Sequence, residues 1–324
     1  MILLPPSMGE EEVRVNPIWQ SGQQSPQAPF MQGWGAGKSP LSKTRMSELL
    51  FHKESMLRLG FFFGILAVMA GWEVLAPRRP WSTPKGMRWL ANLGLVLLDT
   101  LGVRLVFPLA AIGAALFAAG RGWGLLNNAG LPGWLSVVIG IASLDFAIYL
   151  QHAMFHAIPT LWRLHMVHHT DMDFDVTTAV RFHPFEILLS MGIKMGVIML
   201  LGISALAVLL FEILLNGTAM FNHGNVRLPL GIDRVLRLFV VTPEMHRVHH
   251  SIVRQETNSN FGFNLPWWDR IMGTYRAQPA AGHEGMTIGL ENFREAGDLT
   301  LPRLLLLPFV YKSSHYPIGH GDSA

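Results

Sequence analysis

Long apolar runs dominate the middle of the chain. Residues 57–75 are nearly uncharged, 95–119 are apolar apart from Asp99 and Arg104, 135–150 carry only Asp145, and 185–221 contain three charged residues. A soluble core helix seldom runs so far without a polar face, whereas about 20 apolar residues cross a bilayer. The pattern therefore predicts an all-α protein, built as a multi-pass transmembrane helical bundle.

The boundaries of the first three helices follow from prolines and glycines. We expect the first helix over 47–76, stopped by the prolines of PRRPWSTPKG, since proline cannot continue a helix. A second helix is predicted over 95–119, preceded by a short interfacial piece that contains Trp89. A third is predicted over 134–156, where Pro159 follows its end.

The run 185–221 is too long for one ordinary membrane helix. A tight turn at 202–204 would divide it into a hairpin of two short helices and would return the chain to the side from which it came. A single steeply tilted helix would instead put the histidines before and after it on opposite membrane faces, so a shared metal site predicts the hairpin. After the hairpin we expect a short surface helix over 228–241. Near the C-terminus, the apolar piece 301–310 contains Pro302 and Pro308, which are expected to break it, and we place it in the membrane interface.

Ten of the fourteen histidines form two clusters beside these runs. An uncompensated polar side chain is costly there, so the clusters predict a bound ligand. Histidines four residues apart share one helix face, as do positions 1, 4 and 5 of HMVHH and HRVHH. The first cluster comprises His152, His156, His165, His168, His169 and His183, and the second comprises His223, His246, His249 and His250.

The ligand most consistent with these clusters is a pair of metal ions. Imidazole suits zinc, copper and iron alike. The chain has no cysteine, which excludes thiolate-bound zinc, iron–sulfur clusters and disulfides. One zinc ion takes four ligands, so eight to ten histidines imply two ions, and two adjacent redox metals can share the activation of dioxygen.

The charge distribution favours a membrane partner over nucleic acid. The net charge is +3 and the sequence pI is near 9.4, with basic residues scattered around the apolar segments. That arrangement suits anionic lipid headgroups. The basic loop at 78–88 favours the cytoplasmic side, but the flank before the first helix is basic as well, so the side of the N-terminus stays open.

The order of these motifs resembles a known family. The series D145-x3-Y149-x2-H152-x3-H156, LWR-x-H165-x2-H168-H169, RFHP, NHGN, H246-x2-H249-H250 and NFGFNLPWWDRIMGTY is similar to the fatty acid hydroxylase and sterol desaturase superfamily of membrane di-iron oxygenases. The resemblance covers residues 136–275 and is closer to the sterol-desaturase-like branch. A paired HxxxH at the fourth box, found in some fatty acid hydroxylases, is absent because Ala219 precedes His223 by four residues.

The resemblance implies a helical membrane domain capped on the cytosolic side by a histidine-rich di-metal site. It implies two iron ions, with zinc as a possible substitute, dioxygen as co-substrate, and hydroxylation or desaturation of an unactivated carbon in a lipid such as a sterol or fatty acyl chain. Nine of the ten clustered histidines are then ligand candidates, with His183 a tenth. No haem-binding HPGG is present, so electrons are expected from a separate reductase, ferredoxin or small cytochrome.

Several polar residues are candidates for orienting the ligands by hydrogen bonds, as is usual for metal-bound imidazole. Asp145 could instead cap a helix or pair with an arginine, and Asn258 could simply make a turn. Trp267 and Trp268 are expected at the headgroup level. The candidates are Asp145, Tyr149, Glu186, Asn258 and Asp269.

The residues divide into four predicted segments: a flexible polar tail (1–46), N-terminal membrane helices (47–132), a histidine-box catalytic domain (133–275) and a C-terminal interfacial tail (276–324). Two other functions fit clustered histidines in a membrane protein. A metal transporter or di-haem carrier would place histidines at mid-helix, whereas these boxes lie at predicted helix ends. A zinc-dependent lipid hydrolase normally uses a glutamate within HExxH, which no box contains. The substrate stays open, as does the choice between hydroxylation, desaturation and ether cleavage.

Overall fold

The computed structural model describes residues 41–311 and 317–318, with side chains from residue 56 onward. Residues 1–40 of the predicted polar tail lie outside this range. The chain divides into two units, 1–48 and 49–324, and the candidate membrane spans and histidine boxes all belong to the second. The described residues of this second unit form helices, with two isolated β-bridges and no extended strand. The all-α prediction is confirmed.

Five stretches of the described residues are long and apolar enough to cross a membrane, as expected of an integral membrane protein. The first belongs to α1 (Leu41–Leu75), which begins six residues before the predicted start because no glycine or proline occurs between 41 and 59. The five stretches are Met56–Leu75, Lys85–Asn128, Gly133–Ala157, Pro184–Leu201 and Ala205–Asn222.

The predicted single helix over 95–119 is wrong. The chain forms α2 (Lys85–Val106) and α3 (Ala110–Arg121), followed by the short α4 (Leu125–Asn128). Pro108 lies between α2 and α3, and proline both lacks an amide hydrogen and clashes with the preceding helical turn. Trp89 belongs to α2 itself rather than to a separate interfacial piece.

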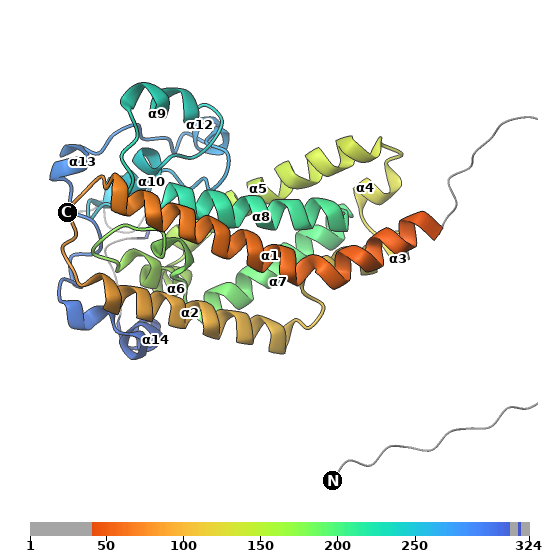
Figure 1. Cartoon of the computed structure of the whole chain (residues 1–324), viewed down its shortest axis with the longest axis horizontal. Helices are drawn as coiled ribbons and strands as arrows, with labels where there is room; N and C mark the ends of the chain where they lie inside the picture. The colour runs from red at the N-terminus through yellow and green to blue at the C-terminus, as the bar shows by residue number, and fades with distance from the viewer. Residues whose placement is uncertain (1–40, 312–316, 319–324) are drawn as a thin grey trace, which may run out of the picture. The chain divides into compact units, whose positions relative to one another are not determined.

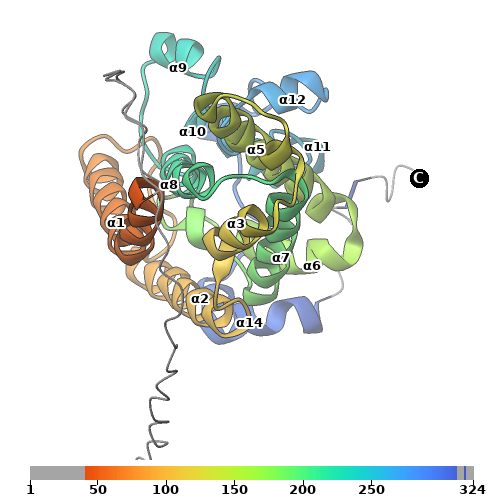
Figure 2. The same cartoon turned by 90° about the vertical axis from the view of Figure 1, so that its right-hand side faces the viewer.

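The third helix and the hairpin are confirmed. α5 spans Gly133–Ala157, and the hairpin consists of α7 (Pro184–Leu201) and α8 (Ala205–Asn222). Gly202 makes the turn with φ 69°, a left-handed conformation that glycine adopts without strain. The Ser204 hydroxyl accepts a hydrogen bond from the Ala207 amide and so caps α8. Viewed along the bundle, α3 lies beside α7 and α8 (Figure 2), and buried side chains of α3, α5, α7 and α8 form one apolar core.

Shorter helices gather at the end of the bundle where α8 finishes (Figure 1). They carry or cover the histidines: α6 (Pro159–His169), η1 (Thr178–Val180), α9 (Leu230–Leu236), α10 (Pro243–His249), α11 (Arg254–Thr257), α12 (Trp267–Ile271), α13 (Gly282–Gly285) and η2 (Ala296–Leu299). The surface helix predicted over 228–241 is thus the shorter α9.

The last helix, α14 (Leu301–Val310), is not broken by its prolines. Pro302 lies in the first turn, where no amide donor is needed, and Pro308 lies in the last turn. Leu304 and Leu307 pack against the buried Trp162 of α6 in a second apolar cluster. α14 therefore supports the helix that carries the second histidine box.

Candidate metal centre

Nine of the ten predicted ligands come together in two groups. In each group every residue offers one ring nitrogen, and these nitrogens all lie within 4.8 Å of one another. All nine side chains are buried. The first group is His152, His156, His165, His169 and His249, and the second is His168, His223, His246 and His250.

Helix geometry explains how each HxxHH box serves both groups. Residues i and i+4 of a helix share a face, while i+3 points to the neighbouring face on the other side of residue i. In α6, His165 and His169 belong to the first group and His168 to the second. In the box of α10 the assignment is reversed: His246 and His250 belong to the second group and His249 to the first. Two helical boxes facing each other thus build two neighbouring sites.

The two groups adjoin each other. The rings of His169 and His250 are stacked with centroids 4.7 Å apart, and those of His165 and His168 lie 5.2 Å apart. The boxes at 165–169 and 246–250 are therefore at the same end of the bundle. The hairpin of α7 and α8 makes this possible, since it returns the chain to that end before His223.

Backbone carbonyls hold the outer nitrogens of three histidines. Nδ1 of His152 lies 2.7 Å from the Phe261 carbonyl, Nδ1 of His249 lies 2.7 Å from that of Ser259, and Nδ1 of His223 lies 2.8 Å from that of Ala219. A carbonyl only accepts, so each Nδ1 carries the hydrogen and the Nε2 lone pair points inward. This is the usual support for metal-bound imidazole.

Two of the predicted orienting side chains touch a histidine directly. Nδ1 of His165 lies 2.7 Å from Oε1 of Glu186 at the start of α7, and both side chains are buried. Nδ1 of His156 lies 3.0 Å from Oδ1 of Asn258. The side chain of Asn258 thus faces the cluster, where sequence alone favoured a simple turn.

The other three orienting candidates hold the loop that carries the Ser259 and Phe261 carbonyls. Asp269 accepts hydrogen bonds from the amides of Phe261 and Gly262, at 2.7 and 2.9 Å. Tyr149 bonds to Thr274, whose hydroxyl in turn donates to Asp269. These contacts act on the ligands through the backbone rather than directly.

Asp145 fastens the next part of the same loop. Its carboxylate accepts from the Asn264 side chain at 2.8 Å, from the Leu265 amide at 3.2 Å and from Nε1 of Trp268 at 2.7 Å. Neither the arginine pairing nor the direct histidine contact considered from the sequence is among these bonds.

His183 lies outside both groups. Its Nδ1 accepts from the Phe185 amide at 3.2 Å and so caps α7, while Nε2 lies 3.2 Å from the Leu305 carbonyl. Both ring nitrogens are thus used for local structure. The RFHP motif places this histidine at the start of a helix rather than among the other nine.

The inner nitrogens fit a metal ion. Nε2 of His156, His169 and His249 and both ring nitrogens of His246 and His250 are buried without a hydrogen-bond partner among the described residues. Each unsatisfied buried polar atom costs about 1–3 kcal/mol. Nitrogen ligation would satisfy them together, and imidazole is a ligand that iron and zinc both accept.

Electrostatics keep these rings neutral. Burial lowers the pKa of His223 to about 3, and burial together with neighbouring histidines lowers the pKa of the six other imidazoles outside the membrane spans well below its usual value. At neutral pH each ring is therefore neutral and keeps one unprotonated nitrogen, whose lone pair can bind a metal ion.

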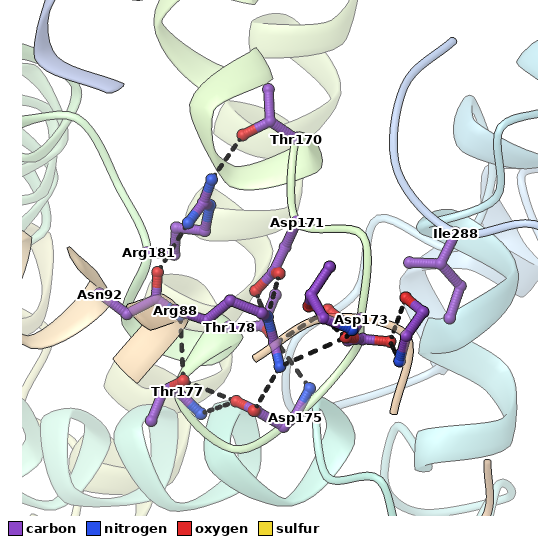
Figure 3. Close-up of polar contacts among 12 residues, drawn as sticks. Arg88, Asn92, Thr170, Asp171, Asp173, Asp175, Thr177, Thr178, Arg181 and Ile288 are labelled. Carbon is purple, nitrogen blue, oxygen red and sulfur yellow. Dashed lines mark hydrogen bonds and ion pairs between the residues drawn. The ribbon is translucent and has the colours of Figure 1, made fainter. Parts of the chain in front are cut away.

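A buried ion network, not predicted from the sequence, lies behind the HMVHH box at 165–169 (Figure 3). Arg88 of α2 is fully buried and donates to both carboxylate oxygens of Asp171, at 2.6 and 2.9 Å, and to Asp175 at 2.9 Å. Asp173, in the same segment, accepts from the Ser82 and Thr83 amides at 2.9 and 2.8 Å. The signal was present: three aspartates alternate directly after HMVHH, and buried acids require partners.

A second buried arginine holds the end of α6 (Figure 3). Arg181 donates to the Val167 carbonyl at 2.9 Å, to the Thr170 hydroxyl at 2.7 Å and to Asn92 of α2 at 2.8 Å. Burial lowers its pKa to about 10, which still leaves the guanidinium charged at neutral pH. A cation near the carbonyl end of a helix is favourable, so this contact stabilises the turn that presents His168 and His169.

The part of the chain that carries the histidine boxes is similar to known proteins. Residues 137–274 match the family model described as fatty acid hydroxylase, a stretch that includes all nine grouped histidines. The chain is 32% identical over 148 residues to ornithine lipid hydroxylase OlsE of Rhizobium tropici, covering 46% of this chain and 44% of that protein. It is 31% identical over 161 residues to alkylglycerol monooxygenase of Homo sapiens, covering 49% and 34%.

A longer but weaker similarity extends over most of the chain. Cholesterol 25-hydroxylase of Rattus norvegicus is 24% identical over 297 residues, covering 89% of this chain and 90% of that protein. The chain spans less than half the length of the two preceding relatives. No solved structure matches the chain significantly.

Proposed function

We propose that this chain is a membrane oxidoreductase of the fatty acid hydroxylase family, whose model its residues 137–274 match, and that it uses dioxygen to oxidise a C–H bond of a lipid. The observation that carries the proposal is the pair of adjoining groups of buried, neutral histidines at one end of a membrane bundle. The names of the relatives, two hydroxylases and a monooxygenase, favour hydroxylation over desaturation.

We assign one iron ion to each histidine group. The five histidines around His152 would hold the first and the four around His223 the second, while His183 is left out because its nitrogens are bonded elsewhere. When bound, two irons would supply the activation of dioxygen. Zinc fits the same nitrogens but has no redox chemistry, so it would occupy the site without supporting the reaction.

The protein's own residues orient the ligands and exclude water. The carbonyls of Phe261, Ser259 and Ala219 fix which ring nitrogen faces inward. Phenylalanine rings pack directly on the histidines: Phe182 stacks on His168 at 4.5 Å between centroids. A site shielded in this way favours attack on the substrate over side reactions with water.

Hydroxylation consumes one dioxygen, two electrons and two protons, and it yields the alcohol and one water. We propose that the electrons come from a separate reductase, ferredoxin or small cytochrome. We place the histidine end on the cytoplasmic side, where the basic loop at 78–88 also lies. The proposed domain division keeps 47–132 as membrane helices, 133–275 as the catalytic domain and 276–324 as a C-terminal segment.

The test is metal analysis combined with isotope labelling. The protein, purified in lipid nanodiscs and loaded with iron, is reduced and exposed to ¹⁸O₂, and the lipids are examined by mass spectrometry. We expect two irons per chain and one labelled oxygen in a lipid product. His168→Gln should lose iron and product, whereas the matched control His183→Gln should keep both. A wild-type protein that binds no iron, or equal activity with zinc, would refute the proposal.

A further inference from the structure

An exposed apolar surface lies beside the metal centre, outside the five candidate spans. It is formed by α9 with the turn after it and by α12, which carries exposed side chains of Trp267, Ile271 and Met272. Ile271 is 71% exposed. The α9 part consists of Leu230, Ile232, Val235, Leu238 and Phe239, each at least half exposed. We call these eight residues the α9–α12 face.

Hydrogen bonds join the two helices into one surface. Nε1 of Trp267 donates to the Leu238 carbonyl at 2.6 Å, and Arg270 donates to the Arg237 carbonyl at 3.1 Å. In both views α9 and α12 lie at the outside of the bundle, on the same side as α5 (Figures 1 and 2). An exposed apolar surface of several large side chains marks contact with a membrane or a partner.

The depth of α12 relative to the membrane follows from its contact with α5. Trp268 donates to Asp145 and packs on Phe146, with ring centroids 4.8 Å apart. Asp145 lies twelve residues before Ala157, the end of α5, which corresponds to about 18 Å along the helix. Since α5 is a candidate span, α12 is held beside a membrane-embedded part of it.

The depth at which α9 begins follows from α1. The Arg227 amide donates to the Ala76 carbonyl at 2.9 Å, directly after Leu75, an apolar residue that is 86% exposed at the end of the first span. The segment leading into α9 is therefore level with the last lipid-facing residue of α1. The α9–α12 face thus lies between the membrane surface and the level of the middle of α5.

The charges around this face are positive. Arg227, Arg234 and Arg270 are exposed, whereas the acids of the two helices, Asp233 and Asp269, are buried. Asp233 pairs with Arg237, and Asp269 accepts from the loop amides. Exposed arginines above an apolar surface match anionic headgroups above acyl chains.

We propose that the α9–α12 face is inserted into the leaflet on the histidine side, with its arginines at anionic lipid headgroups. The face is an in-plane anchor that adds to the lipid contact of α1 and α5. It fixes the histidine cap against the bilayer. The proposal rests on the membrane location of the bundle and is independent of the iron chemistry.

The test uses the absence of cysteine from the chain. Nitroxide labels are attached at Ile271→Cys and, separately, Val235→Cys in the full-length protein, reconstituted in nanodiscs of phosphatidylcholine and phosphatidylglycerol. Collision with oxygen reports lipid, and collision with a nickel chelate reports water. Leu97→Cys, on the exposed apolar side of α2, is the lipid reference, and Gln278→Cys is the water reference.

Insertion predicts a high oxygen-to-nickel ratio at both labels, close to that of Leu97→Cys and well above that of Gln278→Cys. A ratio like that of Gln278→Cys would overturn the proposal and leave the face free for a protein partner. Spin–spin coupling between labels with low access to both reagents would also overturn it, because a second copy of the chain would then cover the face. Two independent label positions keep the result from depending on one local distortion.

Discussion

Replacing Arg88 by methionine tests whether the ion network behind the second box stabilises the metal centre. Arg88, Asp171 and Asp175 are all fully buried. Without the guanidinium, Asp175 keeps hydrogen bonds from Trp89 and Thr177, but Asp171 keeps only the Thr178 hydroxyl among the side-chain donors of this network. Asp171 is therefore the group whose buried charge is left least compensated.

Removing one partner of a buried ion pair costs about 3–5 kcal/mol. The charge of Arg181 also acts on Asp171, and together with Arg88 it lowers the pKa of that carboxyl, so we expect a cost near the lower end, about 3 kcal/mol. That is a large part of the roughly 5–15 kcal/mol by which folded proteins are stable. At about 2–4 °C per kcal/mol, the unfolding midpoint should fall by about 6–12 °C.

The assay is thermal unfolding of purified protein in detergent, with wild type, Arg88→Met, Asp171→Asn and the double variant. Neutralising Asp171 in the Arg88→Met background should restore at least about 1 kcal/mol, because coupled neighbours show interaction energies of about 0.5–3 kcal/mol. Single effects that simply add, or a loss below about 1 kcal/mol for Arg88→Met, would refute the account of the network.

Three further predictions concern the site and the hairpin. Glu186→Gln removes the carboxyl acceptor of His165 and should weaken iron binding about 10–100-fold in a chelator competition, while the exposed Glu295→Gln should leave it unchanged. Gly202→Ala should lower the unfolding midpoint, because φ at this residue is 69° and the added Cβ would lie 2.8 Å from the Trp123 carbonyl oxygen. The control Gly196→Ala, whose Cβ would meet no atom within 4 Å, should raise the unfolding midpoint. Metal-free protein should lose stability as the pH falls below about 6.5, because burial keeps the histidines of the folded state unprotonated while those of the unfolded chain take up protons. The free energy of unfolding should fall by up to about 1.4 kcal/mol per pH unit for each such histidine. A free energy of unfolding that does not change between about pH 7 and 5.5 would contradict this.

The convergence of nine histidines could be predicted because two strong local signals coincide. Helical spacing places the rings of each box on one side of its helix, and the length of the run 185–221 favours a hairpin that returns His223 to the side of His152. Both signals depend only on short-range geometry. The break at Pro108 could also have been predicted, since proline ends a helix. The apolar length of 95–119 favoured a single helix instead, and that prediction is wrong.

The support of the ligands could not be predicted in the same way. The acceptors for His152, His249 and His223 are backbone carbonyls, which every residue has, so residue type does not indicate them. Arg88 and Asp171 are 83 residues apart, and the sequence around either residue does not indicate the other as its partner. His183 is the converse case, since its motif resembles a ligand box while its ring caps α7.

The loop 258–269 couples the metal centre to the depth of the membrane. Asp145, midway along α5, fixes Trp268 and Asn264, and Asp269 fixes the amide of Phe261, whose carbonyl holds His152. Every link is a buried or part-buried hydrogen bond, and buried polar groups that lose a partner cost about 1–3 kcal/mol each. The loop therefore cannot slide along α5 without breaking several bonds at once. Under the proposed function, the histidines would be held at a set level in the bilayer, and that level would decide which carbon of a lipid, counted from its headgroup, can reach the site.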